Sequence, residues 1–238
     1  MRITVVVPAL NEEKHIGNIL RSLLSQSLLP HEILVVDNGS EDDTKKIAGS
    51  FPGVKVIEEP KRGLHHARQR GLEEASGDVV IATDADCIAP EHWVENLVRP
   101  LADPHVVETY GPIAFYDGHP FDRWASEVIY PLFLRITHAL GQPNPPGGNH
   151  AVRKSAALAV GGYDTPFAED IHLARKLKRV GKIVYVPQAK NYTSSRRISE
   201  EGRWNTYLLH TKNVVRRLLK LPEDYGNYYR SRTKVRPK

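Results

Sequence analysis

The sequence predicts an α/β fold in which a mostly parallel central sheet is flanked by helices. Short, continuously apolar segments of strand type alternate with amphipathic segments of helix type through the first hundred residues. This alternation is typical of a parallel sheet that is covered on both faces. Acidic residues also follow directly after two of the apolar segments. In such sheets ligands bind beyond the carboxyl ends of the strands, so we expect a binding site at that edge.

The first hundred residues contain the clearest periodicity. Apolar, β-branched runs predict strands at Ile3–Val7, Glu32–Val36, Val54–Ile57 and Val79–Ala82. Helices are expected after Asn11, from Ser40 to Ile47 and from His65 to Ala75. Asn11 is expected to cap the first of these helices, with Glu12 and Glu13 in its first turn. Its apolar face is formed by Ile16, Ile19, Leu20, Leu23 and Leu24, which recur at helical spacing.

The second half of the chain is less regular. We predict helices at Glu91–Val98, Phe121–Leu140, Asp170–Val180 and Arg203–Leu219, and strands at Val106–Tyr110 and Ile183–Val186. Pro131 is expected to kink the long helix, and the Pro/Gly-rich segment Gln142–Gly148 is expected to be irregular. The long helix carries an apolar stripe that we expect in the core. The alternative is that its outer part contacts an acceptor or a membrane.

Composition limits the class of protein. A chain of 238 residues can bury one substantial core. Its single cysteine, Cys87, excludes an internal disulfide and fits a reducing, cytoplasmic setting. No apolar run approaches the roughly 20 residues of a membrane-spanning helix. The net charge of +5 is concentrated at the end of the chain, where ten Lys or Arg face two acidic residues between residues 203 and 238.

Three acidic residues stand at strand ends. Asp37 follows the second predicted strand, and Asp84 and Asp86 follow the fourth. If this pair leaves the strand in extended form, both carboxylates point the same way, because side chains at i and i+2 share a side. Carboxylate oxygens suit Mg²⁺ or Mn²⁺, which bind through a few carboxylates together with substrate phosphates. An Asp-x-Asp pair alone is a weak signal, because Asp is common in turns.

Five elements in order resemble the signature of family 2 glycosyltransferases. They are Val7-Pro8-Ala9-Leu10-Asn11-Glu12-Glu13, Val35-Val36-Asp37-Asn38-Gly39-Ser40, Thr83-Asp84-Ala85-Asp86, Gly147-Gly148-Asn149 and Ala168-Glu169-Asp170-Ile171-His172-Leu173. The resemblance covers residues 2 to 187. It implies a GT-A fold and transfer of a sugar from a UDP- or GDP-linked donor to an acceptor hydroxyl with inversion. It also implies one domain over residues 1–220, with a nucleotide-sugar half at 1–100, an acceptor half at 101–220 and a basic tail at 221–238.

The resemblance also implies roles for individual residues. The nucleotide and substrate pocket would be formed by Pro8, Ala9, Asn11, Glu12, Asp37, Arg68, Asp84, Ala85, Gly148 and Glu169. For Arg68, a surface ion pair is the alternative. Asp86, with Asp84 in support, would bind a Mg²⁺ or Mn²⁺ ion that stabilises the leaving diphosphate. Asp170 would be the general base. The alternative for Asp170 is a helix cap, because it stands at the start of a predicted helix.

Basic residues complete the predicted site. Arg196 and Arg197 lie on a Thr/Ser-rich loop after the last sheet strand, and paired guanidinium groups suit diphosphate oxygens. The tail at residues 221–238 is expected to contact an anionic membrane surface, because it combines aromatic and basic residues. A solvated charged end is the simpler alternative for the tail.

Two other functions are the alternatives. A nucleotidyltransferase would favour a Gly-rich, Lys-bearing loop after the first strand, where this chain has Pro8 to Glu12. The same loop argues against a dinucleotide-binding dehydrogenase, because no Gly-x-Gly-x-x-Gly follows Val7. A basic nucleic-acid-binding protein would need basic and aromatic residues over a folded face. Here they interleave only near the end of the chain, at Trp204, Tyr207, Tyr225, Tyr228 and Tyr229.

Overall fold

The computed structural model describes residues 1–196, 198, 202, 208–209, 212–213, 216 and 221. The strands are β1 (Ile3–Ala9), β2 (Glu32–Asp37), β3 (Val54–Glu58), β4 (Val79–Thr83), β5 (Cys87–Ile88), β6 (Val106–Tyr110), β7 (Ile113–Phe115), β8 (Asn149–Arg153), β9 (Lys182–Tyr185) and β10 (Asn191–Thr193). The helices are α1 (Ile16–Leu24), α2 (Thr44–Gly49), α3 (Leu64–Glu74), α4 (Trp93–Val98), α5 (Pro120–Ala139), α6 (Lys154–Ala159) and α7 (Glu169–Leu177), with a 3₁₀ turn at Arg99–Ala102.

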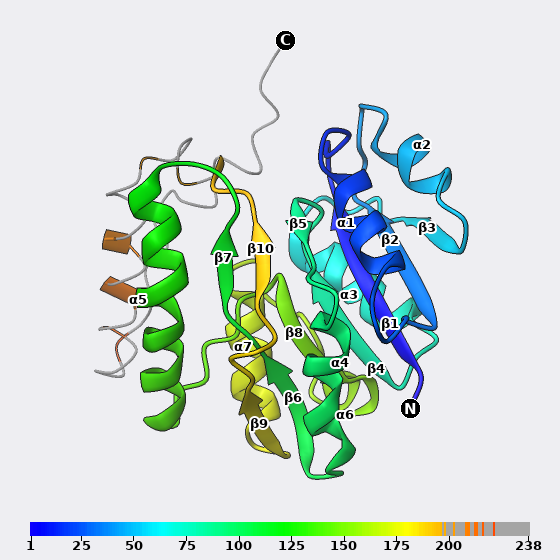
Figure 1. The fold of residues 1–238 in the computed structure, drawn as a ribbon. Coiled ribbons are helices and arrows are strands. Elements are labelled where there is room, and N and C mark those ends of the chain that lie inside the picture. Colours follow the sequence, from blue (N-terminus) through cyan, green and yellow to red (C-terminus); the bar gives the residue numbers. More distant parts are fainter. Residues whose placement is uncertain are drawn as a thin grey trace.

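The central sheet has the strand order β3-β2-β1-β4-β8-β6-β9 (Figure 1). Neighbouring strands are parallel except at β8, which is antiparallel to both β4 and β6. A second, three-stranded sheet has the order β5-β10-β7. The prediction of a mostly parallel sheet flanked by helices is therefore confirmed.

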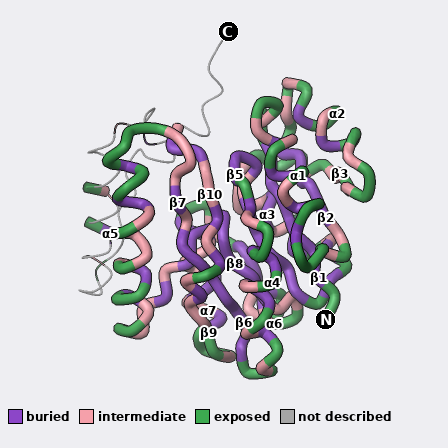
Figure 2. The backbone as a smooth tube through the Cα atoms, viewed as in Figure 1, coloured by how far each residue is buried: buried purple, intermediate pink, exposed green. Residues whose placement is uncertain are grey.

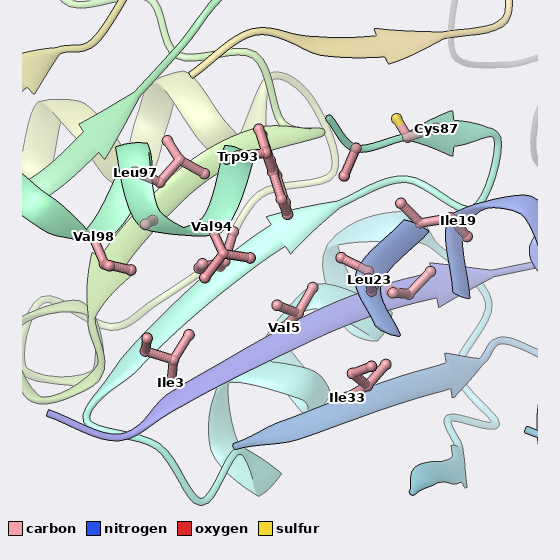
Figure 3. Packing of buried hydrophobic residues seen from close by; sticks show 14 of the residues in the cluster. Ile3, Val5, Ile19, Leu23, Ile33, Cys87, Trp93, Val94, Leu97 and Val98 are labelled. Carbon is pink, nitrogen blue, oxygen red and sulfur yellow. The ribbon is translucent and has the colours of Figure 1, made fainter. Parts of the chain in front are cut away.

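Helices cover both faces of the central sheet, because the side chains of its strands alternate between two cores. On one face, Val5 of β1 packs with α1 and α4; Figure 3 shows Ile19 and Leu23 of α1 and Trp93 of α4 in this cluster. On the other face, the neighbouring residue Val6 packs in a cluster that includes α3, α6 and α7. Because both faces of these strands are buried, their sequences are continuous apolar runs.

Helix starts differ from the predictions. Helix α1 begins at Ile16 and has no acidic residue in its first turn, so Asn11 is not its cap. Helix α2 begins at Thr44 and not at Ser40. The apolar face of α1 is buried at four of its five predicted positions, while Leu24 is 39% exposed. Of the predicted helix Arg203–Leu219, residues 208–209, 212–213 and 216 are helical, and the others lie outside the described residues.

Helix α5 is the main departure from the predicted core. It continues through Pro131, whose carbonyl accepts a hydrogen bond from the Tyr185 hydroxyl at 3.2 Å. The expected core stripe is largely at the surface (Figure 2). Exposed fractions of about one half occur along it, at Trp124, Val128, Ile129, Leu132 and Ile136. In the part of the chain that the structure describes, no helix is both long and apolar enough to span a membrane.

Candidate active site

Two loops at the carboxyl edge of the sheet are held together by hydrogen bonds. The Asn11 N–H donates to Ser40 Oγ at 3.0 Å, and Asn11 Oδ1 accepts from the Glu41 N–H at 2.8 Å. The Glu12 N–H donates to Thr44 Oγ1 at 2.7 Å. Asn11 has a φ of +56°, a left-handed conformation that Asn adopts more readily than most residues. Asn11 thus shapes the loop after β1 instead of capping α1.

Asp37 lies beside this pair of loops. Its buried carboxylate accepts hydrogen bonds from the N–H groups of Gly39 at 3.2 Å and Ser40 at 3.1 Å, which tightens the turn after β2. Pro8 and Ala9 are buried at the end of β1, where Ala9 pairs in register with Asp37. The residues predicted to meet the nucleotide are therefore brought to one edge of the sheet.

The turn after β4 does not have the extended form that was predicted. The Cys87 N–H donates to the Asp84 carbonyl oxygen at 3.2 Å, which closes a tight turn. The two carboxylates consequently have different partners. Asp84 Oδ1 accepts from Arg68 Nη2 at 2.8 Å, whereas Asp86 Oδ1 accepts from Thr193 Oγ1 at 3.2 Å. Ala85, between them, is buried in the core.

A guanidinium group faces Asp86. Arg196 Nη2 forms an ion pair with Glu12 Oε1 and lies 3.5 Å from Asp86 Oδ2. Three residues that are far apart in the sequence thus meet beyond the ends of β1, β4 and β10. Arg197, predicted as the partner of Arg196, lies outside the described residues.

Asp117, just after β7, holds the loop that carries Arg196. Its carboxylate accepts from Ser194 Oγ at 2.7 Å and from the Ser195 N–H at 2.6 Å. Burial alone raises the pKa of Asp117, but these hydrogen bonds outweigh it and hold the pKa below its usual value. The sequence analysis did not identify Asp117 as a site residue, because its partners lie almost 80 residues away along the chain.

Arg68 bridges two carboxylates inside the protein. Its guanidinium is 3% exposed, forms an ion pair with Glu169 Oε1 through Nη1 and bonds Asp84 through Nη2. Gly147 and Gly148 lie directly against this bridge, with Gly148 next to the Asp84 carboxyl. The structure therefore places Arg68 inside a buried ion-pair cluster.

Asp170 lies in the first turn of α7, and the N-cap position is held by Ala168 with a φ of +46°. Asp170 is therefore not the helix cap. Its Oδ1 accepts from the Ile171 N–H at 2.7 Å. Burial and, secondarily, the charge of Glu169 raise the pKa of Asp170 to about 7, although Arg68 opposes the rise. A carboxyl group with this pKa can accept a proton near neutral pH.

A buried polar chain, missed by the sequence analysis, runs from β6 to the loop after α6. Glu108 Oε1 lies 2.9 Å from His150 Nδ1, and His150 Nε2 lies 3.0 Å from the Tyr163 hydroxyl. Burial raises the pKa of Glu108 well above its usual value and lowers the pKa of His150 to about 3, so both side chains are neutral. The available signal was a carboxylate in the middle of a buried strand.

Comparison with known proteins identifies the family. The profile described as glycosyl transferase family 2 matches residues 4–161. Succinoglycan biosynthesis protein ExoA of Rhizobium meliloti is 31% identical over 210 residues, which are 78% of this chain and 63% of that protein. Glucosyl-dolichyl phosphate glucuronosyltransferase of Haloferax volcanii is 27% identical over 177 residues, 69% of this chain and 56% of that protein.

Solved structures agree with this match. Glucosyl-3-phosphoglycerate synthase from Mycobacterium tuberculosis, in complex with Mn²⁺, UDP-glucose and phosphoglyceric acid, superposes with a TM-score of 0.66. It is 26% identical and covers 94% of this chain and 81% of its own. The predicted GT-A fold is thereby confirmed. This chain spans between 40% and 63% of the length of three curated relatives that it matches. By the match over residues 4–161, the chain belongs to glycosyl transferase family 2.

Proposed function

We propose that the chain is an inverting glycosyltransferase that moves a sugar from a nucleoside diphosphate sugar to an acceptor hydroxyl. The observation that carries this proposal is the carboxylate of Asp170, whose pKa is raised to about 7 and which is linked through Glu169 and Arg68 to the turn that holds Asp86. Direct displacement needs a base on the acceptor side and a stabilised leaving group on the other.

In this scheme Asp170 accepts the proton of the acceptor hydroxyl as its oxygen bonds to the anomeric carbon. The bond from that carbon to the diphosphate oxygen breaks, and the diphosphate leaves with the bonding electrons. Arg196 would stabilise the negative charge of the leaving diphosphate. The Arg196 guanidinium already lies between Glu12 and Asp86 at the predicted donor side. A nucleotidyltransferase or a nucleic-acid-binding protein would leave the raised pKa of Asp170 without a role.

The donor set around Asp86 fits a hard divalent cation. Asp86, Glu12 and Thr193 offer only oxygen atoms, the ligands that Mg²⁺ and Mn²⁺ prefer. Within the described residues no group of three or more His, Cys, Asp or Glu could hold a metal, so phosphates and water would complete the coordination. When bound, the metal would neutralise charge on the leaving diphosphate. The buried Arg68 holds Asp84 at 2.8 Å, whereas the guanidinium that faces Asp86 lies 3.5 Å away, so we assign the direct contact to Asp86.

For the nucleotide we propose the edge formed by Pro8, Ala9, Asn11, Glu12 and Asp37. Support comes from the meeting of these residues at the carboxyl ends of β1 and β2, where parallel sheets bind ligands. UDP-linked sugars are the first donors to test, because a structural neighbour binds UDP-glucose with Mn²⁺.

For the acceptor we propose a lipid-linked substrate at the cytoplasmic face of a membrane. One relative is named for a dolichyl phosphate substrate. The outer face of α5 offers a second argument. It exposes large apolar side chains together with Arg135, which suits contact with an anionic bilayer surface. The basic residues at 221–238 would add to that attraction.

Calorimetry tests the donor site. UDP, GDP and their sugar conjugates would be titrated with Mn²⁺, with Mg²⁺ and with EDTA, into the wild type and Asp86→Asn. Asp103→Asn is the matched control, because Asp103 precedes β6 at the opposite edge of the sheet. We expect metal-dependent binding of one nucleotide that is lost only in Asp86→Asn. Absence of binding for every nucleotide with either metal would refute the proposal.

A further inference from the structure

A single buried guanidinium connects the two sides of the candidate site. Arg68 comes from α3, in the nucleotide half. Each of its two terminal nitrogens contacts a different carboxylate. Nη2 lies 2.8 Å from Asp84 Oδ1 and Nη1 pairs with Glu169 Oε1. The Glu169 side chain is 5% exposed, so this pair is shielded from water and from salt.

The glycine pair at residues 147–148 closes over this bridge. A Cβ atom on Gly147 would lie 2.2 Å from Arg68 Nη1, and a Cβ on Gly148 would lie 2.7 Å from Asp84 Oδ2. Real Cβ atoms do not approach so closely, so a side chain at either position would have to displace the Arg68 or Asp84 side chain from the bridge. The backbone at residues 147–148 thus packs directly against the ion-paired side chains.

Each partner of Arg68 adjoins a residue with a proposed role in transfer. Asp84 begins the tight turn that presents Asp86, and Glu169 directly precedes Asp170 on α7. We propose that Arg68 is a positioning residue that fixes the Asp84–Asp86 turn and the first turn of α7 in one arrangement, and that it does not bind the donor. This inference rests on the proposed function for the meaning of Asp86 and Asp170. The coupling itself can be measured without any substrate.

The charges that act on Asp170 make the coupling measurable. Asp170 interacts with Glu169 on its own helix, Arg68 on α3, Asp84 after β4, Glu108 on β6 and Tyr163 after α6. Arg68 is the cation in this set, and its charge lowers the pKa of Asp170, whereas the charges of Glu169 and Asp84 raise it. Loss of Arg68 should therefore make Asp170 harder to ionise, and loss of the Glu169 charge should make it easier.

The experiment is a carboxyl ¹³C NMR titration of Asp170, with the signal assigned by its absence in Asp170→Asn. Arg68→Met should move the titration midpoint upward and Glu169→Gln should move it downward, each by about 1–3 pH units. Arg70→Met is the control, because Arg70 lies on the same helix but pairs with Glu74 at the surface. It should leave the midpoint unchanged.

A conservative variant covers the case in which Arg68→Met does not fold, since removal of Arg68 leaves two carboxylates unpaired. Arg68→Lys keeps the charge but not the fork geometry that reaches both partners. We expect its turnover to fall about 10–100-fold, with donor affinity changed by less than about threefold. If Arg68→Lys lost donor affinity, and if turnover fell by no more than the affinity did, Arg68 would be a donor ligand. That result would overturn the proposal.

The proposal would also be overturned if the titration midpoint of Asp170 did not move in either Arg68→Met or Glu169→Gln. If the wild type binds no nucleotide sugar, the proposed function fails. The titration still decides whether Arg68 is coupled to Asp170.

Discussion

Replacement of Asp170 by Asn should remove transfer activity and yet stabilise the protein at alkaline pH. With a pKa of about 7 for Asp170, the ionised fraction is about one tenth at pH 6 and about nine tenths at pH 8. Wild-type turnover should therefore rise about tenfold per pH unit below pH 7 and level off above it. Asp170→Asn should be slower by about 10²–10⁴-fold, the usual contribution of a general base.

The raised pKa of Asp170 also affects stability, which should fall with rising pH whereas turnover should rise. Between about pH 4 and pH 7 the folded state holds the Asp170 proton while the unfolded state has released it, so wild-type stability falls as pH rises through this window. The rise from 3.8 to about 7 sets a ceiling of about 4 kcal/mol on this loss. Asp170 is only partly buried, and solvent screening should reduce the effect to about 1–3 kcal/mol. Asp170→Asn avoids this loss and should be the more stable protein at pH 8.

Two assays measure these effects. Release of the nucleoside diphosphate would be followed from about pH 5.5 to about pH 9 for the wild type and Asp170→Asn. Urea unfolding at pH 4.5 and at pH 8 would give the stabilities. Asp164→Asn is the control, because that carboxylate pairs with Lys176 at the surface and should change neither quantity. An acid limb centred near pH 4, or equal stabilities at pH 8, would refute the role and environment assigned to Asp170.

Two further predictions concern packing and the surface. Gly147→Ala should lower the free energy of unfolding by about 1–3 kcal/mol in urea titrations, because its Cβ would strike the buried guanidinium. Gly49→Ala, where a Cβ meets nothing within 4 Å, is the control, and an equal effect of both would contradict this packing. The double variant Trp124→Glu and Leu132→Glu on α5 should weaken flotation with phosphatidylglycerol vesicles at least about tenfold. Unchanged flotation would assign vesicle binding to another part of the chain.

Six of the ten described strands were predicted, because a strand buried on both faces is a continuous apolar run in the sequence, whereas β5, β7, β8, β10 and the strand order were not predicted. The predicted and observed bounds of β6 coincide, and those of β1, β2, β3 and β4 differ by one or two residues at the carboxyl end. Three of these extensions end in a polar residue, at Asp37, Glu58 and Thr83, where the strand continues beyond its apolar run. The residues named by the resemblance after β1, β2 and β4 lie at the carboxyl edge of the sheet.

Local geometry at the site was less predictable, because it depends on partners distant in sequence. Asn11 looked like a helix cap, but its side chain accepts a hydrogen bond from Glu41 and its backbone is left-handed. The two carboxylates of the Asp84–Asp86 turn were expected to point the same way, and Arg68 and Thr193 hold them apart. Periodicity also assigned the α5 stripe to the core, because it cannot distinguish a buried apolar face from an exposed one.

The buried ionisable groups beside Asp170 are stabilised in two different ways, whereas Asp170 itself titrates near neutral pH. Asp84 and Glu169 each form an ion pair with the permanent charge of Arg68. Glu108 and His150 avoid charge altogether, because burial favours the neutral form of each. A protonated Glu108 can donate to His150 Nδ1, which leaves the ring proton on Nε2 for the Tyr163 hydroxyl. Asp170 accepts a hydrogen bond from the Ile171 N–H, and because its pKa is raised to about 7 its carboxyl group can exchange a proton near neutral pH.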